Sequence, residues 1–382
     1  MVPAAVDEQH NLSTLLPLMQ RDSPLVLRKV ANCWGRQPFL ENPSVGSLKT
    51  TWRIHPMELR TAWEADCHFL QASVGQFLEW ERSTESLSSE DGNPFAKFDR
   101  KVYWAYADYK HVKELGDDWA KALESMIDWS VFDCDKSATD STVWLGTEGS
   151  HTPLHYDTYG VNLVAQLHGS KKWTLYPPAD TASLSPTRVP YEESSVFSRV
   201  DARMPDLDRF PRFAEAHPLV ATLEPGDILF VPNHWWHFVE AVETSLSVNV
   251  WLESPGDPED RRSESIARVL MTSLADSLDA EASIFVGSNW LNPTEEAVWP
   301  LAETIAIAHL AFKGIHSDSE EAVQDNRGDA SATRGGFSVR EMVDAITAPD
   351  VLQMVVERIM RSRGQVQDQD VLGTRHLEDG SK

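Results

Sequence analysis

A chain of 382 residues, 41% of them apolar and 14 of them Trp, is long enough for one large domain with additions or for two domains. Its 34 basic and 59 acidic residues give a formal net charge of −25, which disfavours nucleic-acid partners because non-specific binding to phosphates depends on Lys and Arg. Three scattered cysteines exclude a disulfide framework and fit a reducing compartment, so we expect a cytoplasmic location, with the nucleus as an alternative.

The N-terminal third carries few strong signals. Residues 1–22 lack a signal-peptide pattern and are predicted to be a loose segment. Residues 23–257 are predicted to form one domain with its core at 100–255. Within it, Ser73 and Gln76 have the spacing of a capping box, which predicts the start of a short helix. No apolar run approaches the roughly 18–20 residues of a membrane span, so we expect no membrane partner.

Residues 141–252 change to short apolar runs separated by Gly and Pro, such as "TVWLGTE", "GVNLVAQLHG" and "ILFVP". Many short strands with this punctuation are typical of a β-sandwich or a β-barrel. A longer insert at 179–216, which contains four prolines, interrupts the runs. The residues therefore predict a mainly β fold with flanking helices.

After residue 257 the pattern becomes helical. Residues 258–315 are amphipathic and are predicted to form a helical extension, which either mediates homodimerisation or covers one end of the barrel. Residues 316–336 are polar and contain several glycines, as in a disordered linker. Residues 337–363 are predicted to form one or two C-terminal helices, and 364–382 a polar tail.

The stretch "HTPLHYD" concentrates metal-binding side chains at the start of this β-rich segment. Because residues i and i+2 of a strand point the same way, His155 and Asp157 share one face. An imidazole and a carboxylate are two of the three ligands of a 2-His-1-carboxylate triad, which holds Fe(II) and leaves coordination positions open. The third ligand must then be a distant histidine. His234 and His237, in "PNHWWHFVE", are the candidates, and spacing alone does not choose between them.

Each of these motifs also has an interpretation without a metal. An isolated HxD pair is more often two surface residues, and a lone histidine among aromatic residues is more often part of the core. The two motifs together, both in a β-rich segment, favour the metal site. We expect His151 and His168 to be exposed and to have no role.

Polar residues on other predicted strands point to a cosubstrate. Lys171 and Lys172, in "HGSKKWTLYPP", must point to opposite faces, so only one can face the barrel interior. A buried ammonium is costly unless it is paired, and the carboxylate of a cosubstrate would pair it; two solvent-facing lysines are the alternative. Asn249, between two valines, either is satisfied by its strand or lines the site.

The segments "GTEGSHTPLHYDTYGVNLVAQLHGSKKWTLYPP", "LEPGDILFVPNHWWHFVEA" and "VNVW" resemble the JmjC family of oxygenases. The resemblance is strong over 100–255, weaker over 20–100, and nearest to the small, hydroxylase-like (cupin-like) group that includes the asparaginyl hydroxylase of hypoxia-inducible factor. It implies a double-stranded β-helix (jelly-roll, cupin) core, with Fe(II) as cofactor and 2-oxoglutarate and O2 as cosubstrates. "WAYADYKHV" and "RVPYEESSVFS" are similar to a member that associates with a small heat-shock protein, so the resemblance also implies such a partner.

The resemblance assigns a role to each candidate residue. His155, Asp157 and His237 match the iron ligands, and this match favours His237 over His234. Residues implied to bind or line the 2-oxoglutarate pocket are Lys171 and Thr152 for its distal carboxylate, Asn162 and Asn249 for its walls, and Tyr106 as a further donor.

The implied function is hydroxylation of a side chain in a protein substrate, and an acidic enzyme suits a basic segment. Alternatives within the family are hydroxylation of a tRNA base, which the net charge of −25 disfavours, and removal of an N-methyl group from a histone or another protein. A different class is an adaptor or chaperone-associated protein with little or no turnover. Trp104, Tyr106 and Trp235 either rim a peptide-binding pocket or belong to the core.

Overall fold

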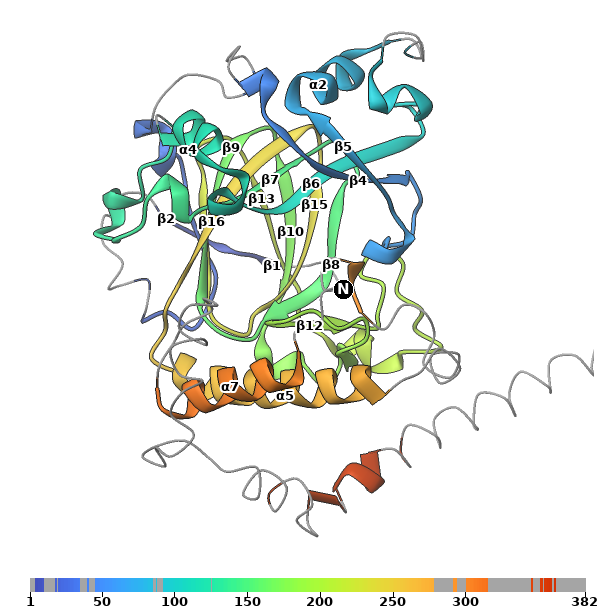
Figure 1. Ribbon diagram of the computed structural model, residues 1–382, viewed down its shortest axis with the longest axis vertical. Helices are drawn as coiled ribbons and strands as arrows, with labels where there is room; N and C mark the ends of the chain where they lie inside the picture. The colour runs from blue at the N-terminus through green and yellow to red at the C-terminus, as the bar shows by residue number, and fades with distance from the viewer. Residues whose placement is uncertain are drawn as a thin grey trace, which may run out of the picture. The chain divides into compact units, whose positions relative to one another are not determined.

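The computed structural model describes most of the first 277 residues and short parts of the rest (Figure 1). Described are 4–277 apart from gaps at 10–17, 19, 35–39, 41–44, 85–86, 88–91 and 125, then 291–293, 300–314, 345, 351–352, 354–358 and 361. The chain divides into two units, Met1–Trp299 and Pro300–Lys382, each described by itself.

Two β-sheets form the core of the first unit (Figure 1). In spatial order, the seven-stranded sheet contains β1 (Ala4–Ala5), β13 (Leu219–Leu223), β10 (Lys171–Tyr176), β15 (Trp236–Ala241), β8 (His151–Asp157), β12 (Ser195–Ser198) and β11 (Pro186–Thr187). The nine-stranded sheet contains β2 (Asp7–Gln9), β3 (Leu25–Leu27), β14 (Ile228–Val231), β9 (Val161–His168), β16 (Ser245–Leu252), β7 (Thr142–Gly146), β6 (Tyr103–His111), β4 (Lys49–Pro56) and β5 (His68–Ser73).

Helices flank these sheets or lie in the connections. The α-helices are α2 (Val74–Arg82), α3 (Val112–Leu115), α4 (Asp117–Glu124) and α5 (Asp257–Ser277) in the first unit and α7 (Leu301–Phe312) in the second. Short 3-10 helices are η1 (Val30–Cys33), η3 (Val45–Ser47), η4 (Glu64–Asp66), η6 (Pro94–Lys97), η7 (Trp129–Phe132), η8 (Ala138–Asp140), η9 (Pro178–Asp180) and η10 (Pro211–Glu215).

Eight antiparallel strands build a jelly roll, because the chain passes repeatedly between the two sheets. β7, β9, β14 and β16 lie in the nine-stranded sheet, and β8, β10, β13 and β15 lie in the seven-stranded sheet. β9 and β16 are almost wholly buried along their length, as expected for short apolar strands covered on both faces. The predicted double-stranded β-helix with flanking helices is therefore confirmed.

Three of the apolar clusters among the described residues hold the sheets in place. Between the sheets, Trp173 and Leu175 of β10 pack in one cluster with Val164 of β9 and Leu229 of β14. The face of the seven-stranded sheet that carries Leu154, Trp236 and Phe238 packs on the insert through Leu184, Val196 and Ala216. The largest cluster joins the nine-stranded sheet to α2 and α4, and in it Trp52 stacks on Phe77 with ring centroids 4.1 Å apart.

The predicted capping box is confirmed at the start of α2. The Gln76 amide donates to Ser73 Oγ over 3.2 Å, and the Ser73 amide donates to Gln76 Oε1 over 2.9 Å. Strands β4 and β5 extend the nine-stranded sheet before the predicted core at 100–255.

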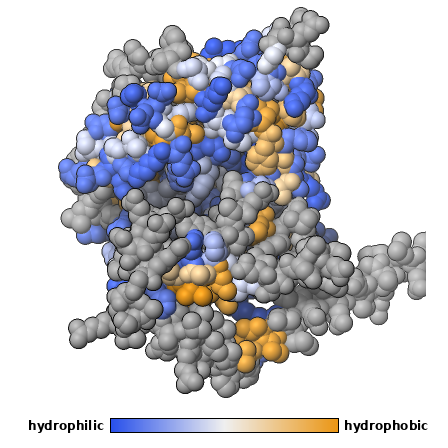
Figure 2. All heavy atoms as spheres, in the orientation of Figure 1, coloured by the Kyte–Doolittle hydropathy of each residue, from blue (hydrophilic) through white to orange (hydrophobic). Residues whose placement is uncertain are grey.

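The predictions for the C-terminal part fall largely outside the described residues, namely those for the linker at 316–336, most of the helices at 337–363 and the tail at 364–382. None of the helices among the described residues is long and apolar enough to span a membrane. On the face shown in Figure 2, hydrophilic residues cover most of the described surface, which fits the high charge of the chain.

The prediction of a loose segment at 1–22 is wrong for Ala4–Gln9. β1 pairs in parallel with β13, and β2 pairs in parallel with β3, so this segment adds an edge strand to each sheet. Between them Val6 is 3% exposed and packs in the cluster between the sheets. Strands of two or three residues are too short to show a period in the sequence, which is why the pattern missed them.

We expect Val6→Ala to lower the free energy of unfolding by about 1–2 kcal/mol, because it removes two buried methyl groups from the cluster between the sheets. Urea denaturation followed by tryptophan fluorescence measures the change. The control is Ala5→Ser at an exposed neighbour, which should change stability by no more than about 0.5 kcal/mol. Equal stability of the two variants would contradict the packing of Val6.

Candidate metal centre

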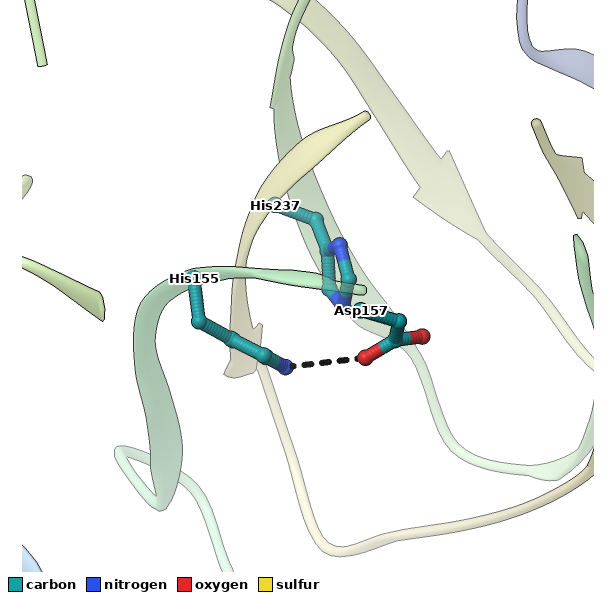
Figure 3. Close-up of side chains that lie close together, drawn as sticks. All are labelled: His155, Asp157 and His237. Carbon is teal, nitrogen blue, oxygen red and sulfur yellow. Dashed lines mark ion pairs between the residues drawn. The ribbon is translucent and has the colours of Figure 1, made fainter. Parts of the chain in front are cut away.

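The register between β8 and β15 brings the two histidines of the candidate site together. The two strands are antiparallel, and His237 pairs directly with His155. Directly opposite residues in such a pair project to the same side of the sheet, and the two imidazole centroids are 4.2 Å apart. Asp157, two residues after His155, points to the same place (Figure 3). One ligand atom from each residue lies within 4.8 Å of the others.

Backbone carbonyls fix the tautomer of both imidazoles. His155 Nδ1 lies 2.8 Å from the carbonyl oxygen of Pro153, and His237 Nδ1 lies 2.9 Å from that of Trp235. A carbonyl only accepts hydrogen bonds, so each Nδ1 carries the proton and each Nε2 keeps its lone pair for a metal. Burial and the neighbouring His237 lower the pKa of His155 to about 4, against the opposing effect of Asp157. His155 is therefore neutral at physiological pH, as a ligand must be.

Hydrogen bonds to one carboxylate oxygen of Asp157 orient the side chain so that its other oxygen faces the histidines. Its Oδ2 accepts a hydrogen bond from Trp251 Nε1 over 2.9 Å and a longer one from Asn162 Nδ2 over 3.5 Å. Its Oδ1 lies 3.7 Å from His155 Nε2 (Figure 3). Two imidazole nitrogens and one carboxylate oxygen form a donor set that suits Fe(II), so the residues present fit this ion. The role of His155, Asp157 and His237 as ligands stays a prediction.

Lys171 is a buried cation beside neutral partners. It faces the same side of the sheet as His237, because β10 and β15 pair Lys171 with Ala241 and Leu175 with His237. Its side chain is buried, and its Nζ donates to Ser247 Oγ over 2.9 Å and to the Trp144 carbonyl over 3.3 Å. No carboxylate lies within ion-pair distance of Nζ in the part of the chain that the structure describes. Burial lowers the pKa of Lys171 to about 7, despite the opposing charge of Asp108.

Two further predicted residues contact this lysine or its neighbours. Tyr106 Oη accepts a hydrogen bond from Lys171 Nζ over 3.4 Å and is also hydrogen-bonded to Thr152. Burial raises the pKa of Tyr106, so its hydroxyl stays protonated. The hydroxyl groups of Tyr106 and Ser247 thus contact the Lys171 ammonium, and that of Thr152 lies beside Tyr106, an arrangement suited to a carboxylate.

The two predicted asparagines connect this cluster to the metal ligands. Asn249 Nδ2 donates to Asn162 Oδ1 over 2.9 Å, and Asn249 Oδ1 accepts from Trp144 Nε1 over 2.7 Å. Asn162 in turn donates to Asp157. Asn249 is therefore not satisfied by its strand alone but belongs to a buried polar chain.

The sequence missed three residues of the site, namely Ser247, Trp251 and Trp144. Ser247, Asn249 and Trp251 share one face of β16 and contact Lys171, Asn162 and Asp157 respectively. At about 3.3 Å per residue, the strand covers about 13 Å between Ser247 and Trp251. This face therefore extends from the lysine to the predicted metal ligands. Because alternate residues of a strand share one face, the position of Asn249 was the signal that could have identified Ser247 and Trp251.

The other candidate histidines lie elsewhere. The prediction that His151 is exposed is wrong, because its Nε2 accepts a hydrogen bond from the Ala62 amide over 2.8 Å and its ring is buried. Burial lowers the pKa of His151 to about 3. His234 Nε2 points to the carbonyl of Thr158, 2.9 Å away, and not to the triad. His168 and Lys172 are exposed, as expected.

Of the three aromatic residues that either rim a pocket or belong to the core, Trp104 and Trp235 are core residues. Trp104 is 1% exposed, and Trp235 packs in the cluster between the sheets with its Nε1 hydrogen-bonded to the carbonyl of Asp22. Tyr106 is buried as well, but it contacts Lys171.

Comparison with known proteins is consistent with this geometry. Residues 68–257 match the model of the cupin-like domain. HSPB1-associated protein 1 homolog of Danio rerio is 39% identical over 287 residues, 74% of this chain and 61% of that protein. HSPB1-associated protein 1 of Homo sapiens is 42% identical over 61% of this chain and 46% of its own length. Lysine-specific demethylase 8 of Xenopus tropicalis is 39% identical over 28% of this chain and 24% of its own. The chain thus spans about three fifths of the length of the Danio rerio protein and about half of the length of the human one.

We expect Trp251→Phe to weaken metal binding about tenfold, because it removes the indole donor that holds Asp157 Oδ2. Binding of Mn(II), an EPR-visible substitute for Fe(II), to the metal-free protein measures the effect. Trp80→Phe serves as the matched control, since it removes an indole hydrogen bond to the Phe98 carbonyl outside the site. Unchanged Mn(II) affinity in Trp251→Phe would show that the indole does not position the carboxylate.

Proposed function

The chain carries a cupin-like domain of the JmjC family, and on this premise we propose that it is an Fe(II)- and 2-oxoglutarate-dependent oxygenase that hydroxylates a protein side chain. One observation carries the proposal: a buried lysine with two hydroxyl partners faces the same interior as a His–Asp–His cluster whose two histidines are buried. A short dicarboxylic acid with a keto-acid end needs both a metal at one end and a cation at the other.

The residues of the chain have separable roles in this proposal. His155, His237 and Asp157 hold the metal, and the bound metal with 2-oxoglutarate supplies the chemistry that lets dioxygen oxidise a C–H bond. Lys171, in its charged form, pairs with the distal carboxylate, and Thr152 and Tyr106 offer further hydrogen bonds. The polar chain through Asn162 and Asn249 orients Asp157. The apolar cluster around Trp173, whose ring stacks 5.7 Å from that of His237, keeps bulk water away.

The nature of the substrate rests on charge and on relatives. A net charge of −25 favours a basic protein segment over tRNA. The name HSPB1-associated protein 1, carried by four mammalian relatives, supports a small heat-shock protein as a partner of this chain. The name lysine-specific demethylase 8 supports N-methyl demethylation as the second candidate activity. Mass spectrometry of captured proteins separates the two, because hydroxylation adds one oxygen atom and demethylation removes a methyl group.

We expect the purified protein with Fe(II) to form succinate from 2-oxoglutarate, and His155→Ala to reduce this turnover to the level without metal. His168→Ala removes an exposed histidine from β9 and should retain the full rate. Mass spectrometry measures the succinate formed by the unaltered protein and by each of the two variants. Absence of turnover together with absence of iron binding in the unaltered protein would favour an adaptor and contradict the proposed activity.

We expect 2-oxoglutarate binding to take up close to one proton at about pH 8.5 and almost none at about pH 5.5. Lys171, with a pKa of about 7, is largely neutral at the higher pH and must gain a proton to pair with a carboxylate; at the lower pH it is already charged. Calorimetry in buffers with different ionisation enthalpies measures the uptake.

Two variants control this measurement. Lys171→Met should abolish the proton uptake at high pH and weaken binding, whereas Lys172→Met, at the exposed neighbour, should change neither. Equal proton uptake at both pH values, or uptake that persists in Lys171→Met, would contradict the role of Lys171.

A further inference from the structure

The first turns of α5 place four charged residues on one face of the helix. Asp257, Asp260, Arg261 and Glu264 are spaced at i, i+3, i+4 and i+7. From the sequence, we expect this region either to mediate dimerisation or to cover one end of the barrel. The contacts of these four charged residues indicate a more specific role, because each residue touches a segment beside a strand that carries or supports a predicted metal ligand.

The first contact is with the segment that follows Asp157. Asp257 is 3% exposed, and its Oδ1 accepts a hydrogen bond from the Gly160 amide over 2.9 Å. The guanidinium of Arg261 lies 4.0 Å from the centre of the Tyr159 ring. The chain leaving β8 is thus held at two consecutive residues.

The second contact is with the turn that precedes His237. Asp260 Oδ2 accepts a hydrogen bond from Asn233 Nδ2 over 2.9 Å, and its Oδ1 lies 3.4 Å from His234 Nε2. His234 has a left-handed φ of 61°, which is unfavourable for a residue with a side chain and needs support from its surroundings. The same His234 Nε2 lies 2.9 Å from the carbonyl of Thr158, so the two segments are also tied to each other.

The third contact is with the segment before β12, the strand that pairs with β8. Glu264 is 3% exposed, and its Oε1 accepts hydrogen bonds from the Ser194 amide over 3.2 Å and from Arg188 over 2.7 Å. Ser195 pairs with Asp157 in the β8–β12 register. One helix face therefore contacts three segments, each beside a strand that carries or supports a ligand.

We propose that the charged face of α5, centred on Asp260, is a positioning element of the metal centre. It fixes the end of β8 and the start of β15 relative to each other, so that the ligands are held in place before a metal binds. The inference rests on the proposed function, because it takes His155, Asp157 and His237 as ligands. Asp260 touches none of the three and acts only through the turns.

The test is Mn(II) binding to the metal-free full chain, measured by EPR, in Asp260→Ala and Glu259→Ala. Both variants remove one negative charge, but Glu259 is exposed and its side chain pairs with Arg262 of its own helix. Asp260→Ala should weaken Mn(II) binding about tenfold, at the lower end of the effect of outer hydrogen-bond partners, while Glu259→Ala stays within about twofold of the unaltered protein. Asp260→Asn, which keeps an oxygen acceptor, should restore most of the affinity.

Asn233→Ala removes the same hydrogen bond from the side of the turn, so it tests the contact even if Asp260→Ala does not fold. It should weaken Mn(II) binding to a similar extent, and hydrogen–deuterium exchange at 158–160 and 233–235 should rise in both variants. A lower melting temperature with unchanged Mn(II) affinity would make α5 a purely structural helix and overturn the inference. If the unaltered protein does not bind Mn(II), the proposed function itself fails. If the unaltered protein binds Mn(II) and the α5 variants bind it equally well, this inference alone fails.

Discussion

The antiparallel pairing of β8 with β15 is the constraint on which the site depends. It sets His155 directly opposite His237, and the two-residue period of β8 adds Asp157 on the same face. A slip of one residue would turn one histidine to the outer face, where Trp236 and Phe238 pack on the insert. The apolar pattern of β15 therefore fixes the register and, with it, the distance between the predicted ligands. Stability and function share one cause here, because the aromatic residues that anchor the strand also aim its histidine inward.

A second feature is the polar line that crosses an otherwise apolar interior. Hydrogen bonds lead from the Lys171 ammonium through Trp144, Asn249 and Asn162 to the Asp157 carboxylate. Ser247 and Trp251, on the same face of β16 as Asn249, contact the two ends of this line. Buried polar groups cost free energy unless they are satisfied, and Lys171 has hydroxyl and carbonyl partners but no anion among the described residues. In its charged form, Lys171 therefore has no anionic partner among the described residues, and this observation supports the proposal of a negatively charged cosubstrate.

Local rules predicted part of this arrangement, and long-range contacts decided the rest. The two-residue period of a strand was enough to place His155 beside Asp157 and to send Lys171 and Lys172 to opposite faces. The choice between His234 and His237 could not come from spacing, because it depends on a left-handed turn that directs His234 to Thr158. His151 was predicted to be exposed, yet its partner is the amide of Ala62, far away in the sequence. No local pattern carries such pairings, and the same holds for the parallel edge strands around Val6.

The proposed metal site consists of three side chains from two neighbouring strands inside the jelly roll, and it is best tested with crystals grown in Mn(II). Diffraction data collected near the manganese absorption edge locate the bound ion. We expect one strong anomalous peak bounded by His155 Nε2, Asp157 Oδ1 and His237 Nε2. A peak at another place, or an ordered triad without a peak under saturating Mn(II), would contradict it.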